Sequence, residues 1–245
     1  MSSDAENYGG FFQFPLCLLA WKLPFADIMG RAIHYGVVSF LDKTDDGQNW
    51  RRNQTTREDA LKKAQKVIGF TGGDIDRMIE QASEARFFTN QWSGFGRKTC
   101  DVRVRKDLVF GARDDKEPTE REFRILAGIF SAIGAKPYVK IGWLSVQCRA
   151  AGWLSTPPPI TPDLPCGPVY PRGQIERTLA ELLARSLVSG VTYRRGERYW
   201  SNRLTREQLW DAIKVRKLRR LQARSVHAAS DAEKSAAIKE ALGRP

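Results

Sequence analysis

The sequence has few of the residues on which metal sites and nucleophilic catalysis depend, since only 2 of its 245 residues are histidines and 4 are cysteines. No Cys-x-x-Cys pair occurs among Cys17, Cys100, Cys148 and Cys166. The spacing of metal ligands is missing, so we expect reduced thiols, no metal and no other cofactor. Rolling-circle nucleases need a histidine cluster, and ATPases need a Gly-x-x-x-x-Gly-Lys-Ser/Thr loop. Neither pattern is found, and we expect a protein that is not an enzyme.

Long apolar runs are missing too. A membrane-spanning helix needs roughly 20 apolar residues, whereas the best candidate, FFQFPLCLLAW at 11–21, is shorter and contains Pro15. It has neither the preceding basic region nor the following small-residue cleavage site of a secretory signal. We therefore expect a cytoplasmic protein.

Acidic residues are the minority among the charged residues. The 40 Lys and Arg against 28 Asp and Glu give a formal net charge of +12 and an isoelectric point near 9.8. The excess is clustered, and clustered positive charge attracts polyanions such as nucleic acid. A basic charge that serves only solubility is the alternative.

An internal repeat with a period of 100 residues is the most informative pattern in the chain. Residues 72–88 read GGDIDRMIEQASEARFF, and residues 172–188 read RGQIERTLAELLARSLV. Aligned without gaps, Ile75 matches Ile175, and apolar residues recur in both copies at the spacing of an amphipathic helix. Each segment therefore predicts a helix.

Each repeated helix is followed by a predicted β-hairpin with a basic tip. The first hairpin is TNQWSGFGRKTCDVRVRK at 89–106, and the second is SGVTYRRGERYWSN at 189–202, with its turn at Gly196. β-Branched and aromatic residues favour the strands beside each turn. The basic residues are Arg97, Lys98, Arg103 and Arg105 in the first hairpin, and Arg194, Arg195 and Arg198 in the second.

Two more helices are expected before each repeated helix. They cover 25–43 and 56–70 in the first unit, and 119–134 and 140–153 in the second. Capping boxes beginning at Thr55 and Thr119, each with a Glu three residues later, are typical of helix starts. Each unit is thus three helices and a hairpin.

The expected fold is α+β and mainly helical, with two tandem units and a basic C-terminal helix. The predicted domains are 1–112, 113–204 and a basic helix with a flexible tail at 205–245. The Pro-rich stretch 155–168 predicts an extended loop. The Ala- and charge-rich residues 226–245 predict a marginal helix or a disordered tail.

Three helices closed by a two-stranded wing is the plan of winged-helix DNA-binding domains, and both halves resemble it over residues 20–204. In that family the second and third helices form a helix-turn-helix, and the third enters the major groove. The wing contacts the DNA backbone or minor groove. Two tandem winged helices resemble the initiator proteins that bind origin repeats of plasmids and some phages, and FFQFPLCLLA at 11–20 is loosely similar to such replication proteins.

The resemblance implies a recognition helix at 171–187 in the second unit. Pro171 suits the first turn of a helix, and polar residues are expected to lie away from Ile175 and Leu179. Arg and Gln read guanine and adenine edges through paired hydrogen bonds. The implied DNA-contacting residues are Arg172, Gln174, Arg177 and Thr178. Solvated polar residues on an exposed helix are the alternative.

The first unit departs from the family pattern, because its third helix carries Asp74, Asp76 and Glu80, which phosphates repel. This unit is expected to hold only the DNA backbone, or to serve dimerisation.

The segment 205–225 predicts one more helix, with a net charge of +5 over 206–224. Its basic residues include Lys214, Arg216 and Lys217, which we expect to follow the DNA backbone. A solvated charged face is the alternative.

The sequence thus predicts a sequence-specific double-stranded DNA-binding protein. A replication initiator and a transcription regulator of a mobile element both stay open, as do a homodimer and contacts with the replication or transcription machinery. The alternative is a winged-helix scaffold or protein-interaction subunit of a nucleic-acid-processing complex. The salt dependence of binding separates the two classes, because log K falls with log salt by about 0.9 for each phosphate contacted.

Overall fold

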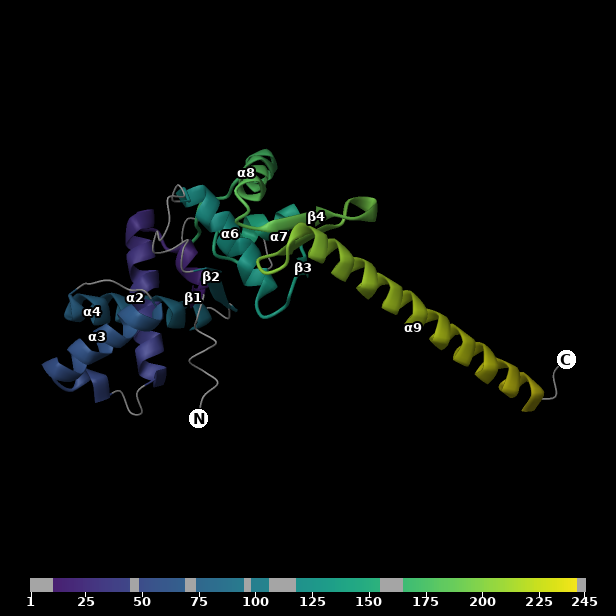
Figure 1. Ribbon diagram of the computed structural model, residues 1–245, viewed down its shortest axis with the longest axis horizontal. Coiled ribbons are helices and arrows are strands. Elements are labelled where there is room, and N and C mark those ends of the chain that lie inside the picture. The colour runs from purple at the N-terminus through teal and green to yellow at the C-terminus, as the bar shows by residue number, and fades with distance from the viewer. Residues whose placement is uncertain are drawn as a thin grey trace.

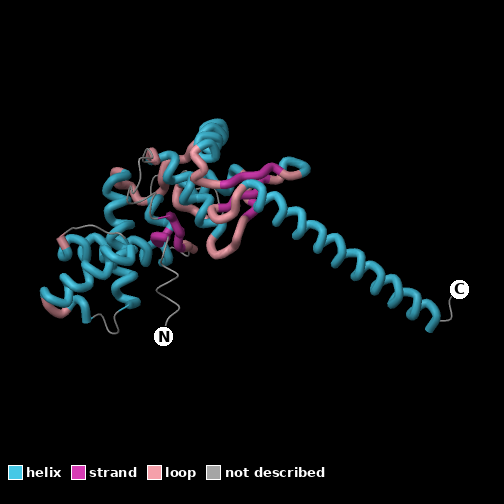
Figure 2. The backbone as a smooth tube through the Cα atoms, viewed as in Figure 1, coloured by secondary structure: helices cyan, strands magenta, loops and turns pink. Residues whose placement is uncertain are grey.

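The structure, a computed structural model, describes residues 11–44, 49–68, 74–94, 98–105, 118–154 and 165–241. These residues form helices and two small antiparallel sheets (Figures 1 and 2). The prediction of a mainly helical α+β fold is confirmed. In this part of the chain, no helix is long and apolar enough to cross a membrane.

The first half of the chain combines helices with a two-stranded sheet. Its strands are β1 (Phe11–Pro15) and β2 (Asp101–Arg105), which pair antiparallel. Between them lie the 3-10 helices η1 (Leu16–Ala20) and η2 (Asn49–Arg51), and the helices α2 (Phe25–Thr44), α3 (Gln54–Ile68) and α4 (Ile75–Gly94). Helix α2 packs mainly against α4. The sheet pairs a strand from the start of the first half with a strand from its end.

The hairpin predicted at 89–106 is wrong, because α4 continues to Gly94 and β2 pairs with β1 instead. Burial explains the longer helix, since the apolar stripe keeps its helical spacing to the last turn. The buried residues of α4 are Met78, Ala82, Ala85, Phe88 and Trp92. The N-terminal stretch Phe11–Pro15 supplies the strand that pairs with β2.

The second half of the chain has the order helix, strand, helix, helix, strand, strand. The elements are α6 (Glu120–Ile133), β3 (Val139–Lys140), α7 (Trp143–Ala150), α8 (Arg172–Ala184), β4 (Ser189–Thr192), the 3-10 turn η3 (Arg194–Gly196) and β5 (Arg198–Ser201). The sheet has the antiparallel order β3-β5-β4. The hairpin predicted at 189–202 is confirmed.

Alternate residues of β5, the central strand, face opposite sides of the sheet. Trp200 belongs to the main core, and its ring crosses Gly190 of β4, where an added Cβ would lie 2.7 Å from the ring. Tyr199 faces the other side and packs under the last helix, α9 (Arg206–Ala241). This smaller cluster contains Tyr138, Val191, Tyr199, Leu209 and Ile213. The sheet therefore lies between two apolar clusters.

Side-chain caps fix where the helices begin. At α6, Thr119 Oγ1 accepts from Glu122 N (3.3 Å) and Glu122 Oε2 accepts from Thr119 N (2.7 Å), which is the predicted capping box. The box predicted to start at Thr55 is wrong. Helix α3 begins two residues earlier than that box predicts, because Asn53 Oδ1 accepts from Thr56 N (2.9 Å) and caps the helix in place of Thr55. An Asn before a helix serves as well as a Thr.

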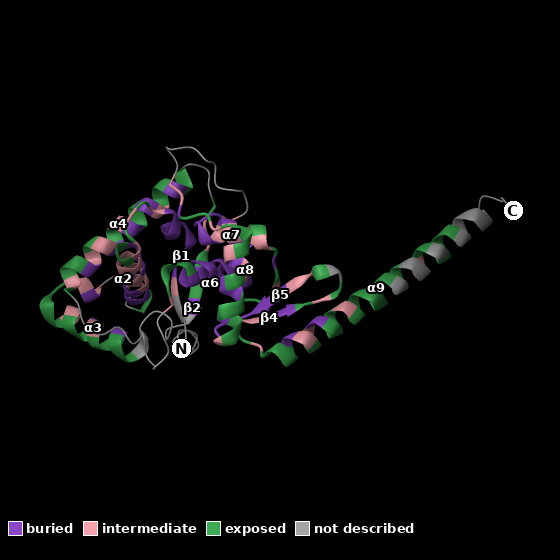
Figure 3. Cartoon of the chain, turned by 90° about the horizontal axis from the view of Figure 1, so that it is seen from above, coloured by how far each residue is buried: buried purple, intermediate pink, exposed green. Residues whose placement is uncertain are grey.

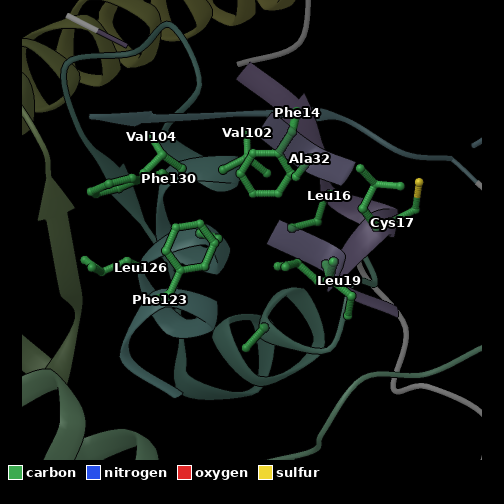
Figure 4. Close-up of a cluster of buried hydrophobic side chains, with 14 of the residues drawn as sticks. Phe14, Leu16, Cys17, Leu19, Ala32, Val102, Val104, Phe123, Leu126 and Phe130 are labelled. Carbon is green, nitrogen blue, oxygen red and sulfur yellow. The ribbon is translucent and has the colours of Figure 1, made fainter. Parts of the chain in front are cut away.

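The main core runs through both halves of the chain. Phe14 of β1 stacks on Phe123 of α6 with ring centroids 6.1 Å apart, and Val102 of β2 lies beside them (Figure 4). The division between residues 112 and 113 stays a prediction, but the hydrophobic core does not divide there. Buried segments of both halves meet at this point (Figure 3).

Arg124 ties α6 to the first half from inside this core. Its side chain is 2% exposed, and Nη1 donates to the Leu19 carbonyl over 2.6 Å. Its Nε donates to Glu120 Oε1 over 2.7 Å, and its guanidinium carbon lies 5.4 Å from the centre of the Phe25 ring. A buried charge is tolerated only with such partners.

Helix α9 leaves the body of the molecule and runs to Ala241 (Figure 1). Thr205 and Gln208 cap its start reciprocally, with N–H···O distances of 2.9 and 3.3 Å. Ile213 is the last buried residue among those described on α9. Residues 226–241, for which the sequence leaves a helix or a tail open, are helical.

Replacing Arg124 with Met is expected to lower the free energy of unfolding by about 3 kcal/mol, because the buried Leu19 carbonyl loses a charged donor. The matched control is Arg121→Met on the exposed side of α6, which should change it by less than about 0.5 kcal/mol. Urea denaturation measures both. Equal stability of the two variants would show that the buried guanidinium does not hold the halves together.

Candidate nucleic-acid interface

Helix α8 turns one face to the core and the other to solvent. Ile175, Leu179 and Leu182 are buried, and α8 packs on α6 and α7. Arg172 and Arg177 are exposed on its outer side. Arg177 Nε makes only a long contact with the Gly173 carbonyl, at 3.4 Å. Its guanidinium is therefore accessible to a ligand.

Two of the predicted base-reading residues do not lie on the exposed face of α8. Thr178 is fully buried, because it follows Ile175 by three residues and precedes Leu182 by four, on the same helix face. Its assignment to DNA contact is wrong. Gln174 is half-buried at the edge of the exposed face.

A single carboxylate holds two of the predicted DNA-contacting arginines. Glu176 Oε1 accepts from Arg172 Nε and from Arg198 Nη2, each over 3.0 Å. These bonds, Arg172 first, lower the pKa of the Glu176 carboxyl. Arg198 begins β5 on the side of Trp200, so it faces α8. The expectation that it lies at the hairpin tip is wrong.

The hairpin tip is the short turn η3. Gly196 adopts φ +73°, a conformation that glycine takes without strain. Arg194 is exposed in this turn, and the side chain of Arg195 lies outside the described residues. The tip thus presents Arg194 to solvent, while Arg198 joins the wing to α8.

A second carboxylate organises the outer face of the sheet. Glu197 accepts from Lys140 Nζ (2.6 Å), from Lys217 Nζ (2.7 Å) and from the Tyr199 hydroxyl (3.0 Å). These bonds join β3, β5 and α9. They hold the pKa of Glu197 at about 2, with the Lys140 bond contributing most, and they raise the pKa of Lys217.

The predicted basic residues of α9 have different surroundings. Lys214 lies 3.8 Å from Asp211 and 5.4 Å from the centre of the Trp210 ring. Arg216 is exposed, with its guanidinium carbon 5.7 Å from the centre of the Tyr138 ring. Lys217 is partly covered and pairs with Glu197.

The described basic residues of the predicted first wing, Lys98 and Arg103, belong to the β1–β2 region and not to a hairpin that follows α4. Lys98 and Arg103 are exposed there. Arg105 ends β2, but its side chain, like the whole of Arg97, lies outside the described residues. At the acidic start of α4, Asp76 already forms an ion pair within the protein, with Arg57 over 2.9 Å.

Sequence reasoning missed three residues that organise this surface, Glu176, Glu197 and Lys140, and also Arg220, which lines a cavity beside α9. For Glu197 the signal was its alternation with Tyr199, which assigns both to one face of the strand. For Arg220 it was a spacing of seven residues from the buried Ile213.

Within the described residues, no three His, Cys, Asp or Glu side chains are grouped so that they could hold a metal ion. A cleft of about 320 Å³ between α2 and α4 includes His34, whose Nδ1 lies 2.7 Å from Gln81 Oε1. Burial lowers the pKa of this histidine.

No protein-family model matches the chain, and no curated protein or solved structure matches it.

The low pKa of Glu197 gives a pH test of the outer-face network. A lowered carboxyl pKa contributes stability above the ordinary value of 4.5, and this is lost as the pH falls toward 2. NMR titration of the carboxyl carbon should give a pKa near 2, and Lys217→Met should raise it. The control Lys214→Met, on the same helix, should not. A native Glu197 that titrates near 4.5 would contradict this network.

Proposed function

We propose that the chain is a sequence-specific double-stranded DNA-binding protein whose second half, residues 119–204, is a winged helix. The observation that carries the proposal is the exposed pair Arg172 and Arg177 on α8, beside a hairpin with Arg194 at its tip. The order helix, strand, helix, helix, strand, strand with a β3-β5-β4 sheet supports it. Helix α8 enters the major groove, and the wing contacts the backbone or minor groove.

Arg177 is the residue best suited to read a base. A guanidinium binds the O6 and N7 atoms of guanine through two parallel hydrogen bonds. Arg172 is held by Glu176, which fixes its direction, and both residues belong to the exposed start of α8. Since Thr178 is buried, base reading depends on this first part of the helix, with Gln174 at its edge.

The net charge of +12 supports a polyanionic partner. Between residues 214 and 224, α9 carries six basic residues and no acidic one. This segment begins beside the sheet and adds contacts to the DNA backbone without reading sequence.

The first half supports the second and does not read bases. Its strands come from both ends of the unit, so β2 pairs with β1 and not with a neighbouring strand after α4 among the described residues. Phosphates near α4 would meet Asp74 and Asp76, which are already engaged in capping the helix and pairing with Arg57. Backbone contact through Lys98 and Arg103, or dimerisation, is the role left for this half.

The arrangement of the DNA target sites distinguishes a replication initiator from a transcription regulator. Footprinting on DNA that flanks the gene gives iterated repeats in an A·T-rich region for an initiator, and one palindrome over a promoter for a regulator.

A protein-interaction subunit is the second candidate, favoured by the apolar side chains on the projecting helix. Val215, Leu218 and Leu221 of α9 are 47%, 59% and 62% exposed. Isolated exposed apolar residues are common, but three at intervals of three residues form a stripe.

Replacing Arg177 with Ala is expected to cost roughly 1–3 kcal/mol of binding to a duplex selected from random sequences, and much less on a random duplex. Arg177→Lys keeps the charge but loses the planar fork, so it should retain random-duplex affinity while losing the preference. Fluorescence anisotropy measures both. Equal losses on the two duplexes would make Arg177 a phosphate contact.

The wing is tested with Arg194 alone, because Arg198 is held by Glu176. Arg194→Ala should weaken specific and random binding about equally and reduce the log–log salt slope by about one unit. The control is Arg203→Ala, an exposed arginine at the base of the hairpin. If Arg194→Ala and Arg177→Ala both leave affinity and slope unchanged, the protein-interaction candidate takes precedence.

A further inference from the structure

A cavity of about 130 Å³ lies between α9 and the outer face of the three-stranded sheet. It is distinct from the exposed face of α8. The polar side chains that line it are four basic residues and two tyrosines: Lys140, Arg216, Lys217, Arg220, Tyr138 and Tyr199.

The helix period brings the basic side chains of α9 to this cavity. Ile213 is buried against the sheet, and Arg216, Lys217 and Arg220 follow it by three, four and seven residues, on the same face of α9. Lys140 reaches the cavity from β3. Like charges brought together repel one another, so this arrangement has a cost that a bound anion removes.

One carboxylate offsets part of this charge. Glu197 bonds both Lys140 and Lys217, but it is not among the described residues that line the cavity, and none of these is acidic. Four cations against one carboxylate leave a local charge of +3. The guanidinium groups of Arg216 and Arg220 carry most of the excess.

The tyrosines serve as walls and not as hydrogen-bond donors to a ligand. The Tyr138 hydroxyl donates to the Ala212 carbonyl (3.4 Å), and the Tyr199 hydroxyl donates to Glu197 (3.0 Å). Arg216 lies over the Tyr138 ring, which limits its movement. The groups left for an anion are therefore N–H donors of arginine and lysine.

We propose that this cavity binds a phosphate group. Its volume equals that of about four water molecules at roughly 30 Å³ each, which accommodates a phosphate group. The planar donors of arginine match phosphate oxygens in pairs. The phosphate is either part of a nucleic-acid backbone or free inorganic phosphate.

The site does not depend on base reading by α8. Arg198 and Trp200 of β5 face α8 and the main core, whereas Tyr199 lines the cavity on the other side. The two proposals can therefore fail separately. Arg177→Ala should lose sequence preference and keep phosphate binding, whereas a variant of the cavity should lose phosphate binding and keep sequence preference.

The experiment titrates the full chain with inorganic phosphate against chloride at constant ionic strength, by calorimetry. Saturable binding of one phosphate is expected. Arg220→Gln should weaken it about tenfold, as the loss of one charge-assisted hydrogen bond implies. Arg219→Gln, the exposed neighbour outside the cavity lining, should change it less than about twofold. Glu197→Gln should tighten binding, because it releases both lysines.

Absence of saturable binding, or equal weakening by Arg219→Gln and Arg220→Gln, would overturn the proposal. Retained helicity of Arg220→Gln by circular dichroism ensures that a loss reflects the site. Adding a random DNA duplex then identifies the source. Displacement of phosphate indicates a backbone phosphodiester, and simultaneous binding indicates free phosphate; both outcomes support a phosphate site.

Discussion

The alternation of side chains along β5 is the constraint on which the second half of the structure depends. As the central strand, β5 bonds to both neighbours, so its register cannot shift without breaking two ladders. Arg198 and Trp200 consequently face α8 and the core, while Glu197 and Tyr199 face α9. A shift by one residue would turn Trp200 away from the core and place Tyr199 or Ser201 in its position. This short strand thus contacts α8 on one face of the sheet and α9 on the other.

Two carboxylates fix the positions of basic side chains on this surface. Glu176 neutralises part of the charge of Arg172 and Arg198, and Glu197 does the same for Lys140 and Lys217. Each also bridges elements distant in sequence. Exposed ion pairs contribute little stability individually, so their main effect here is on direction: they hold long side chains in fixed places. An anion that approaches this surface meets cations already oriented.

Helical periodicity and turn chemistry in the sequence were sufficient to predict most helices, the hairpin at 189–202 and the Thr119 capping box. The hairpin after α4 could not be predicted correctly, because the strand partner of β2 is about ninety residues away and the burial of Trp92 favours helix. Among site residues, the exposure of Arg172 and Arg177 followed from the pattern. The helical spacing also implied that Thr178 is buried, but its polar side chain led to the incorrect prediction that it lies on the surface. The ion pairs of Arg198 and Glu197 depend on tertiary contacts that no local pattern contains.

In helix α9, repulsion between basic side chains acts against the helical conformation. Its first two turns are anchored through Leu209 and Ile213, and the exposed segment 214–224 has only basic charge. Basic residues three and four apart destabilise a solvated helix, and little packing offsets this beyond Ile213. Residues 226–241 contain both signs and many alanines, which favour helix without packing. The basic segment therefore gains helix stability from a bound anion, since ligands that bind the folded state stabilise it. Anion binding beside the sheet and the rigidity of the projecting helix are therefore coupled.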